Sequence, residues 1–197
     1  MSKCIVVGNG IIDNLGKEID SFDVVIRIND FVIKGFEKDV GTKTDIWSRG
    51  GTKRVDVSDC PIVWHTYPPF SNEKEYKKII PFFKDRLVCP VKKDNDYIKD
   101  NDYINEYISP NIDLTFGYGP DGYPHVTTGI RTIVCAISTF GAPVYIAGFR
   151  THGRNEAYYY YDRINKQTIG KTNDHDFQKE YNWLCIMENK KMIIRVL

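Results

Sequence analysis

Short runs of apolar, mostly β-branched residues alternate with helix-length segments along this chain, and no other feature constrains the fold as strongly. A near-continuous apolar run such as Val24-Val25-Ile26 is typical of a strand that is covered on both faces. Strands that alternate with helices form a parallel sheet with helices on both sides. The expected strands are Cys4–Val7, Asp23–Ile28, Pro61–Trp64, Arg86–Cys89, Val144–Ala147 and Met192–Val196. The sequence therefore predicts an α/β fold with a mostly parallel central sheet.

The clearest helix is expected from about Gly129 to Phe140. Its apolar residues keep the spacing of three to four that a core-facing stripe requires. Thr127 and Thr128 supply capping hydroxyls before it, and Gly141 ends it. The stripe consists of Ile130, Ile133, Val134, Ile137 and Phe140.

Two further helices are expected. One begins near His175, where Asn173 or Asp174 can act as the N-cap. The other spans Glu73–Phe83, although Pro81 could end it early. The apolar face of the helix near His175 contains Phe177, Tyr181 and Leu184.

The composition limits the class of protein and its general partners. The chain has 197 residues, with 27 Lys and Arg against 26 Asp and Glu, and a formal net charge of +1. This length is typical of one domain, so we expect residues 1–197 to form a single domain. A near-neutral balance gives no electrostatic footprint for nucleic acid or for an anionic membrane. No apolar run approaches the roughly 18–20 residues that a membrane span needs.

The ends and the cysteines favour a soluble protein in a reducing compartment. Met1–Lys3 is too short for a signal peptide and leads directly into an expected strand. The five cysteines are widely spaced, are odd in number and include no C-x-x-C pair. Buried free thiols are the simplest interpretation, which predicts a cytoplasmic location without anchor or leader.

A glycine turn follows the first expected strand. In Gly8-Asn9-Gly10, the two glycines would let backbone N–H groups approach a phosphate or sugar closely. A third glycine of the dinucleotide fingerprint would fall at Asp13, so that fingerprint is incomplete. The alternative is a purely structural turn in which Asn9 tolerates a positive φ.

Two other segments contain residues suited to ligand binding. Asn29 follows a buried strand, at the edge where α/β folds bind ligands, but it could instead form a local Asx turn. Thr127-Thr128-Gly129 opens a helix, and its hydroxyls and N–H groups can bind an anion as well as cap the helix. Most threonines at helix starts are only caps.

A fourth segment places His175 at the start of a helix, after the tyrosine run Tyr158–Tyr161. Positive partial charge at a helix N-terminus favours the neutral imidazole, which is the form that a general base requires. A lone histidine there is more often a capping residue, and tyrosines more often serve packing. Glu180 lies about 140° around the helix from His175, so the two side chains need not touch.

Taken in this order, the four segments resemble the sialylmotifs of the animal-type sialyltransferase family, over roughly half of the chain. The long motif is matched by Cys4–Gly10, Glu18–Ser21, Arg27–Asn29 and Gly35–Thr44. The short motif is similar to Thr127–Gly129 through Ala147–Phe149, and motif three to Tyr159–Asp162. His175 and Glu180 fit the very short motif, H-x4-E.

The resemblance implies a single Rossmann-like, doubly wound domain, a variant of the GT-A-like glycosyltransferases. It also implies CMP-sialic acid as the donor. His175 would be the catalytic base, and Tyr159 would face the donor phosphate. The other implied donor-binding residues are Asn9, Gly10, Asn29, Thr127, Thr128, Gly129 and Gly148.

The implied reaction is transfer of sialic acid to a hydroxyl of a terminal galactoside glycan. One displacement at the anomeric carbon inverts its configuration, and CMP leaves with its phosphate held by hydrogen-bond donors. The family uses no Asp-x-Asp metal site, so we expect no metal and no cofactor. The pairs Asp94-x-Asp96 and Asp174-x-Asp176 are interpreted as solvated loop and cap residues.

The chain departs from the family pattern at several positions. Val126 and Thr127 replace the usual proline and serine, and Tyr159 replaces a frequent histidine. The cysteine that pairs with the long motif falls near Thr139 or Phe140, which leaves Cys4 unpaired. Two alternatives are a transferase for another CMP-activated ulosonic acid, such as Kdo, and a non-catalytic nucleotide- or glycan-binding relative. The acceptor, the linkage and the oligomeric state do not follow from the sequence.

Overall fold

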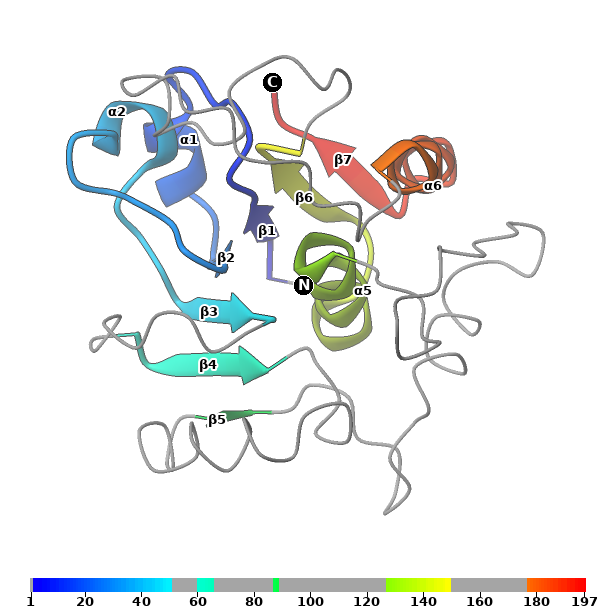
Figure 1. The fold of residues 1–197 in the computed structure, drawn as a ribbon, viewed down its shortest axis with the longest axis horizontal. Helices are drawn as coiled ribbons and strands as arrows, with labels where there is room; N and C mark the ends of the chain where they lie inside the picture. The colour runs from blue at the N-terminus through cyan, green and yellow to red at the C-terminus, as the bar shows by residue number, and fades with distance from the viewer. Residues whose placement is uncertain (1, 51–59, 66–86, 89–126, 150–176) are drawn as a thin grey trace.

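The computed structural model describes residues 2–50, 60–65, 87–88, 127–149 and 177–197. These residues form a seven-stranded sheet of order β5-β4-β3-β2-β1-β6-β7, in which every pairing is parallel (Figure 1). The strands are β1 Cys4–Val7, β2 Val24–Ile28, β3 Ile46–Arg49, β4 Ile62–His65, β5 Leu87–Val88, β6 Val144–Ala147 and β7 Ile193–Arg195. The helices are α1 Gly16–Asp20, α2 Glu37–Val40, α5 Thr128–Phe140 and α6 Phe177–Asn189.

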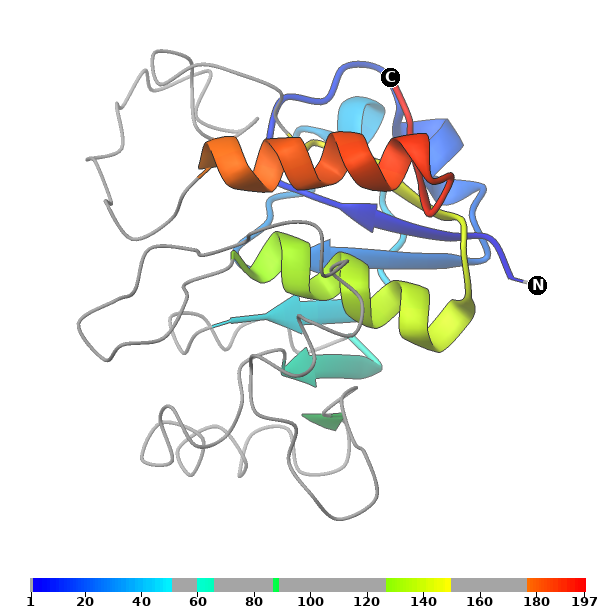
Figure 2. The same cartoon turned by 90° about the vertical axis from the view of Figure 1, so that its right-hand side faces the viewer.

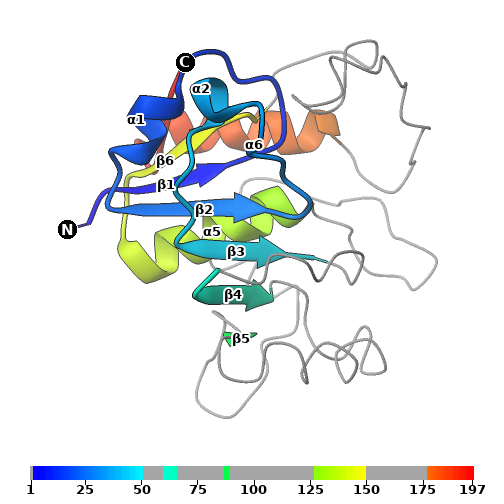
Figure 3. The same ribbon diagram turned by 90° about the vertical axis from the view of Figure 1, so that its left-hand side faces the viewer.

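Helices cover both faces of the sheet, and the residues of β1 alternate between the two cores. Cys4 and Val6 belong to the core under α5 and α6, which lie side by side in Figure 2. Ile5 and Val7 belong to the opposite core, under α1 and α2, which face the viewer in Figure 3. A strand buried on both sides must be apolar at every position, as the Cys4–Val7 run is. The predicted doubly wound α/β architecture is confirmed.

The strand order reverses at β1. The chain proceeds outward from β1 through β2, β3 and β4 to β5, and then returns to place β6 on the other side of β1. Parallel strands on either side of such a switch point have their connections on opposite faces, which opens a crevice outside their carboxyl ends. A ligand site is therefore expected where β1 and β6 end.

Strand β3 is absent from the sequence-based prediction, which was wrong at this position. The strand contains Ser48 and Arg49, both almost fully buried, so its sequence lacks the apolar run of the other central strands. Ser48 has a tertiary partner, since its Oγ lies 2.6 Å from Thr132 Oγ1 in α5, and the Arg49 guanidinium lies over the ring of Trp47 in the same strand. The partner of Ser48 comes from a distant part of the chain, so a strand forms here without the local apolar pattern.

The expected helix near residue 129 is confirmed as α5. Thr127 has an extended backbone, and its side chain accepts a hydrogen bond from the Ile130 N–H, as an N-cap residue should. Gly141 follows the helix with a φ of 83°. The helix expected to begin near His175 is described from Phe177 onward, so its expected N-cap residues lie outside the described residues. The expected helix Glu73–Phe83 also lies outside them.

The described cysteines Cys4, Cys60, Cys135 and Cys185 are free thiols. Burial, assisted by the negative charge of Asp45, raises the pKa of Cys4 to about 12, so this thiol is inert. The prediction that Cys4 is unpaired is confirmed. None of the described helices is both long enough and apolar enough to cross a membrane. The single domain and the cytoplasmic location stay predictions.

Candidate functional site

Two glycine turns meet where β1 and β6 end. The Gly8 N–H donates to the Ala147 carbonyl and the Gly10 N–H to the Gly148 carbonyl, each over 2.8 Å. A β-carbon at position 8 would lie 2.6 Å from the Gly148 oxygen, which is a clash, and Gly148 has a φ of 71°. Both glycines are therefore required for the close approach of these turns. This contact lies at the switch point, where the strand order predicts a ligand crevice.

Asn9 is buried between the ends of β1 and β2, with only 7% of its surface exposed. Its Nδ2 donates to the carbonyls of Ile28 at 3.2 Å and Asp30 at 3.0 Å, which fixes the orientation of the amide. Its Oδ1 is buried and has no hydrogen-bond partner. A buried acceptor in this condition costs about 1–3 kcal/mol unless a ligand or water donates to it. Asn9 is thus more than a turn residue.

Asn29 ends β2 in the left-handed region, with a φ of 48°. Its Oδ1 accepts from the Gly50 N–H at 3.1 Å, and its carbonyl accepts from Nε1 of Trp47 at 2.8 Å. A local Asx turn would bond the backbone two residues on, so the alternative stated for Asn29 is wrong. Asn29 instead links the carboxyl ends of β2 and β3, with its side chain exposed at the same edge.

The N-terminus of α5 lies at this edge as well, since α5 precedes the parallel strand β6 and runs back along the sheet. Of its first four N–H groups, that of Ile130 bonds the Thr127 hydroxyl, and that of Thr127 bonds Glu180. The N–H groups of Thr128 and Gly129 remain, and neither bonds a described residue. Together with the partial positive charge of the helix end, these two donors can bind an anionic oxygen.

Glu180, in the first turn of α6, is 6% exposed and contacts Thr127 with both carboxylate oxygens. Oε1 accepts from the Thr127 N–H at 2.7 Å, and Oε2 accepts from the Thr127 hydroxyl at 2.8 Å. Both donors of Thr127 are therefore occupied. Sequence reasoning placed Glu180 in a motif but assigned it no partner, because the two residues are 53 positions apart.

The opposite side of the same helix end is tied to the sheet. Thr132 Oγ1 donates to the Thr128 carbonyl at 2.7 Å, and Ser48 Oγ in β3 lies 2.6 Å from the same hydroxyl. Since the Thr132 proton is directed at Thr128, Ser48 is the donor to Thr132. The first turn of α5 is thus held by α6 on one side and by β3 on the other.

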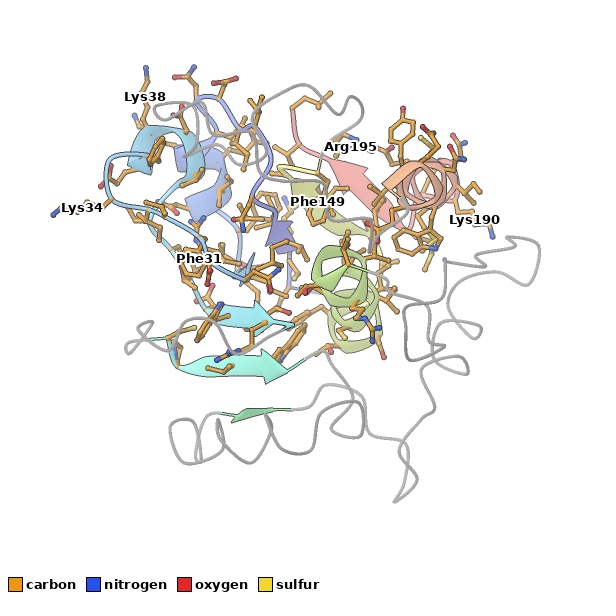
Figure 4. The ribbon with its side chains drawn as sticks, in the orientation of Figure 1. Phe31, Lys34, Lys38, Phe149, Lys190 and Arg195 are labelled. Atoms are coloured by element: carbon orange, nitrogen blue, oxygen red, sulfur yellow. The ribbon has the colours of Figure 1, made fainter. Side chains whose placement is uncertain are left out.

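Phe149 is a second residue that sequence reasoning left out of the site. β-Carbons at Gly129 and Gly8 would lie 2.8 Å and 3.3 Å from its ring atoms Cε1 and Cε2. The ring therefore fills the space between the turn after β1 and the N-terminus of α5 (Figure 4). Its sequence signal was weak, because an aromatic residue after a strand is usually part of the core.

The structure brings together all the predicted donor-binding residues that it describes. They lie at the carboxyl edge of the sheet and are connected by the contacts given above: Asn9, Gly10, Asn29, Thr127, Thr128, Gly129 and Gly148. His175 and Tyr159 lie outside the described residues. Within the described ranges, no group of three His, Cys, Asp or Glu side chains could hold a metal ion.

Comparison with known proteins places this arrangement in context. Residues 1–49 and 76–192 match the model of glycosyltransferase family 29 (sialyltransferase). The CMP-N-acetylneuraminate-beta-1,4-galactoside alpha-2,3-sialyltransferases of Rattus norvegicus and Homo sapiens are each 27% identical to the chain over 211 aligned residues. The alignments cover 97% of the chain and 56% of each relative, so the chain spans about half of their length. The alpha-N-acetylgalactosaminide alpha-2,6-sialyltransferase 1 of Gallus gallus is 60% identical over 47 residues, 22% of the chain.

Solved structures share the fold. A mammalian sialyltransferase superimposes with a TM-score of 0.62 at 22% identity, covering 99% of this chain and 68% of the other. The sialyltransferase CstII of Campylobacter jejuni, solved with the substrate analogue CMP-3FNeuAc, gives a TM-score of 0.60 at 16% identity, covering 99% and 81%. At these identities the likeness concerns the fold, which agrees with the GT-A-like variant expected from the sequence.

Proposed function

Since this chain belongs to glycosyltransferase family 29, the sialyltransferases, we propose that it transfers sialic acid from CMP-sialic acid to a hydroxyl of a terminal galactoside. The single observation that supports this most is the unpartnered Oδ1 of buried Asn9, beside free helix N–H groups at the switch point. A nucleotide needs such a combination, because its base and ribose present donors while its phosphate presents only acceptors.

The proposed role of each residue follows from which hydrogen-bonding groups have no partner among the described residues. Asn9 Oδ1 would accept a hydrogen bond from the cytosine amino group or a ribose hydroxyl. The N–H groups of Thr128 and Gly129 would donate to the anionic oxygens of the donor's phosphate or sugar carboxylate. Thr127 would act indirectly, because its N–H and its hydroxyl both donate to Glu180. Gly10, Asn29 and Gly148 would border the nucleotide.

Local donors suit the chemistry of this reaction. The bond from the anomeric carbon to the phosphate breaks as CMP leaves, and negative charge grows on the phosphate oxygens. Fixed N–H groups aimed at that charge stabilise the transition state without reorganising. The acceptor hydroxyl attacks from the other face, and His175 would take its proton, so that the anomeric centre is inverted. Tyr159 would lie near the phosphate.

We propose that neither a metal nor another cofactor takes part. Helix N–H groups would provide the charge stabilisation that a divalent cation gives in other glycosyltransferases. The galactoside acceptor is suggested by the beta-1,4-galactoside alpha-2,3-sialyltransferases, which match 97% of the chain.

The direct test is a transfer assay on the full chain with CMP-N-acetylneuraminic acid and lactose, analysed by mass spectrometry. We expect sialyllactose in the presence and in the absence of EDTA. CMP-Kdo in a parallel reaction tests the alternative donor. CMP binding by calorimetry with no product from either donor, across a panel of glycan acceptors, would instead indicate a non-catalytic relative.

A further inference from the structure

Arg195, the last residue of β7, connects three separate parts of the structure. Its Nε and Nη2 donate to Oε1 and Oε2 of Glu188 in α6, at 3.0 Å and 2.9 Å. Its Nη1 donates to the carbonyl oxygen of Phe149 at 2.9 Å. The Arg195 side chain is only 11% exposed, and Figure 4 shows it close to Phe149. A paired, largely buried guanidinium of this kind has one defined position.

The carbonyl that Arg195 holds belongs to the residue that shapes the crevice. The Phe149 ring lies against the backbone of Gly129 on α5 and of Gly8 after β1. The preceding residue, Gly148, accepts the hydrogen bond of the Gly10 N–H. A shift of Phe149 would therefore change the distance between the two glycine turns. It would also change the space between the Phe149 ring and the N-terminus of α5.

We infer that Arg195 is a positioning residue for nucleotide binding, which it acts on through the carbonyl of Phe149. The inference rests on the proposed function, because it concerns the same crevice. The two hydrogen bonds to Glu188 fix the orientation of the Arg195 guanidinium. The guanidinium in turn fixes the position of the turn Gly148–Phe149 through its bond to the Phe149 carbonyl. Lysine cannot make the same three hydrogen bonds. Its single ammonium lacks the planar guanidinium, which donates two bonds to the Glu188 carboxylate and a third to the Phe149 carbonyl.

A different explanation would be that Arg195 attracts the anionic nucleotide by its charge alone. The two explanations make opposite predictions for Glu188→Gln. Loss of a negative charge near the site would strengthen CMP binding if charge dominated. If positioning dominates, binding weakens, because a neutral amide offers one acceptor where the carboxylate offers two. Salt also separates them, since charge attraction at a partly exposed site is screened between about 0.05 and 0.5 M.

The experiment measures CMP binding to the full chain by calorimetry for wild type, Arg195→Lys, Glu188→Gln and the control Lys190→Met. Lys190 is exposed, lies one residue after the end of α6, and its replacement by Met changes the net charge by one unit, as Glu188→Gln does in the opposite direction. We expect CMP to bind about tenfold more weakly to Arg195→Lys, and more weakly to Glu188→Gln, at both salt concentrations. We expect wild-type affinity for Lys190→Met.

The backbone amide resonances of Gly8 and Gly129 provide a readout that does not depend on the nucleotide. They should shift in Arg195→Lys and stay in place in Lys190→Met. Unchanged CMP affinity in Arg195→Lys, or tighter binding in Glu188→Gln, overturns the inference. Failure of the wild type to bind CMP would contradict the proposed function itself. That outcome can be told apart from failure of the inference, because it is seen in the wild type alone.

Discussion

Glu180 and Thr127 form a single bidentate unit, in which one buried carboxylate accepts both the N–H and the hydroxyl of the residue that caps α5. The contact joins the first turn of α6 to the N-terminus of α5, although the two residues are 53 positions apart. It also determines which donors remain for a ligand. With Thr127 occupied, the N–H groups of this helix end that bond no other residue in the described part of the chain are those of Thr128 and Gly129.

The first prediction concerns this unit. Glu180→Gln replaces one acceptor by an amide NH₂ group, which then faces a donor of Thr127. We expect a loss of about 1–3 kcal/mol in the free energy of unfolding, together with weaker CMP binding. Urea unfolding and calorimetry measure the two effects. Gln178→Ala, an exposed change in the same turn of α6 that removes only a hydrogen bond to Asn182, is the control; it should leave CMP binding unchanged and alter the free energy of unfolding by no more than about 0.5 kcal/mol. Wild-type stability in Glu180→Gln would show that the unit is dispensable.

The second prediction tests Oδ1 of Asn9, the buried acceptor that has no hydrogen-bond partner in the described part of the chain. In Asn9→Ala, the nucleotide would lose the hydrogen bond to Oδ1 that we propose, and the carbonyls of Ile28 and Asp30 lose the Asn9 donor. We expect CMP affinity to fall at least about tenfold, which corresponds to one hydrogen bond of about 1.4 kcal/mol. The increase in melting temperature on adding saturating CMP should shrink accordingly. An Asn9→Ala variant that folds and binds CMP like the wild type would exclude Asn9 from the site.

The third prediction concerns Gly129, where two effects oppose each other. In an ordinary helix, glycine to alanine stabilises by about 1 kcal/mol. Here the new methyl group would lie 2.8 Å from Cε1 of Phe149, so the ring must move. We therefore expect Gly129→Ala to destabilise the fold and to weaken CMP binding. The smaller ring-free side chain in Phe149→Leu should relieve part of the loss in the double variant. Stabilisation by Gly129→Ala alone would show that the ring is free to move.

The sequence predicted the outline of the fold well because β1 is apolar throughout and β2 begins with the apolar run Val24–Ile26. β1 and β6 have the expected bounds, and Thr127 caps α5 as expected. β3 could not be predicted in this way, since Ser48 and Arg49 are polar although buried, and the hydroxyl that pairs with Ser48 lies far away in sequence, on α5. The pairings of Glu180 with Thr127 and of Arg195 with Phe149 were equally inaccessible, because they depend on how distant segments pack.

The fourth prediction is a pH dependence that originates away from the site. Burial alone would raise the pKa of Asp20. The N–H groups of Lys43 and Thr42, the Thr42 hydroxyl and the charge of Arg27 outweigh burial and lower that pKa below 3.8. A carboxyl with a lowered folded-state pKa stabilises the protein above its unfolded-state pKa, and this stability is lost as the pH falls through the folded-state value. We expect the stability difference between wild type and Asp20→Asn to be full at pH 7, to begin to fall near the unfolded-state pKa of about 4, and to be lost as the pH drops through the lower folded-state pKa. Urea unfolding across this range measures it, and a constant difference would contradict the assignment.

The fifth prediction tests the proposed base. His175 lies outside the described residues, and its role follows from the sequence pattern alone. His175→Ala should lower turnover by at least about two orders of magnitude, because the attacking hydroxyl loses its proton acceptor. CMP affinity should stay near the wild-type value, since Asn9, Thr128 and Gly129 remain in place. Asn9→Ala is the comparison variant, because it should weaken CMP binding, whereas His175→Ala should lower turnover. Full turnover in His175→Ala would assign the base to another residue and leave the proposed nucleotide site intact.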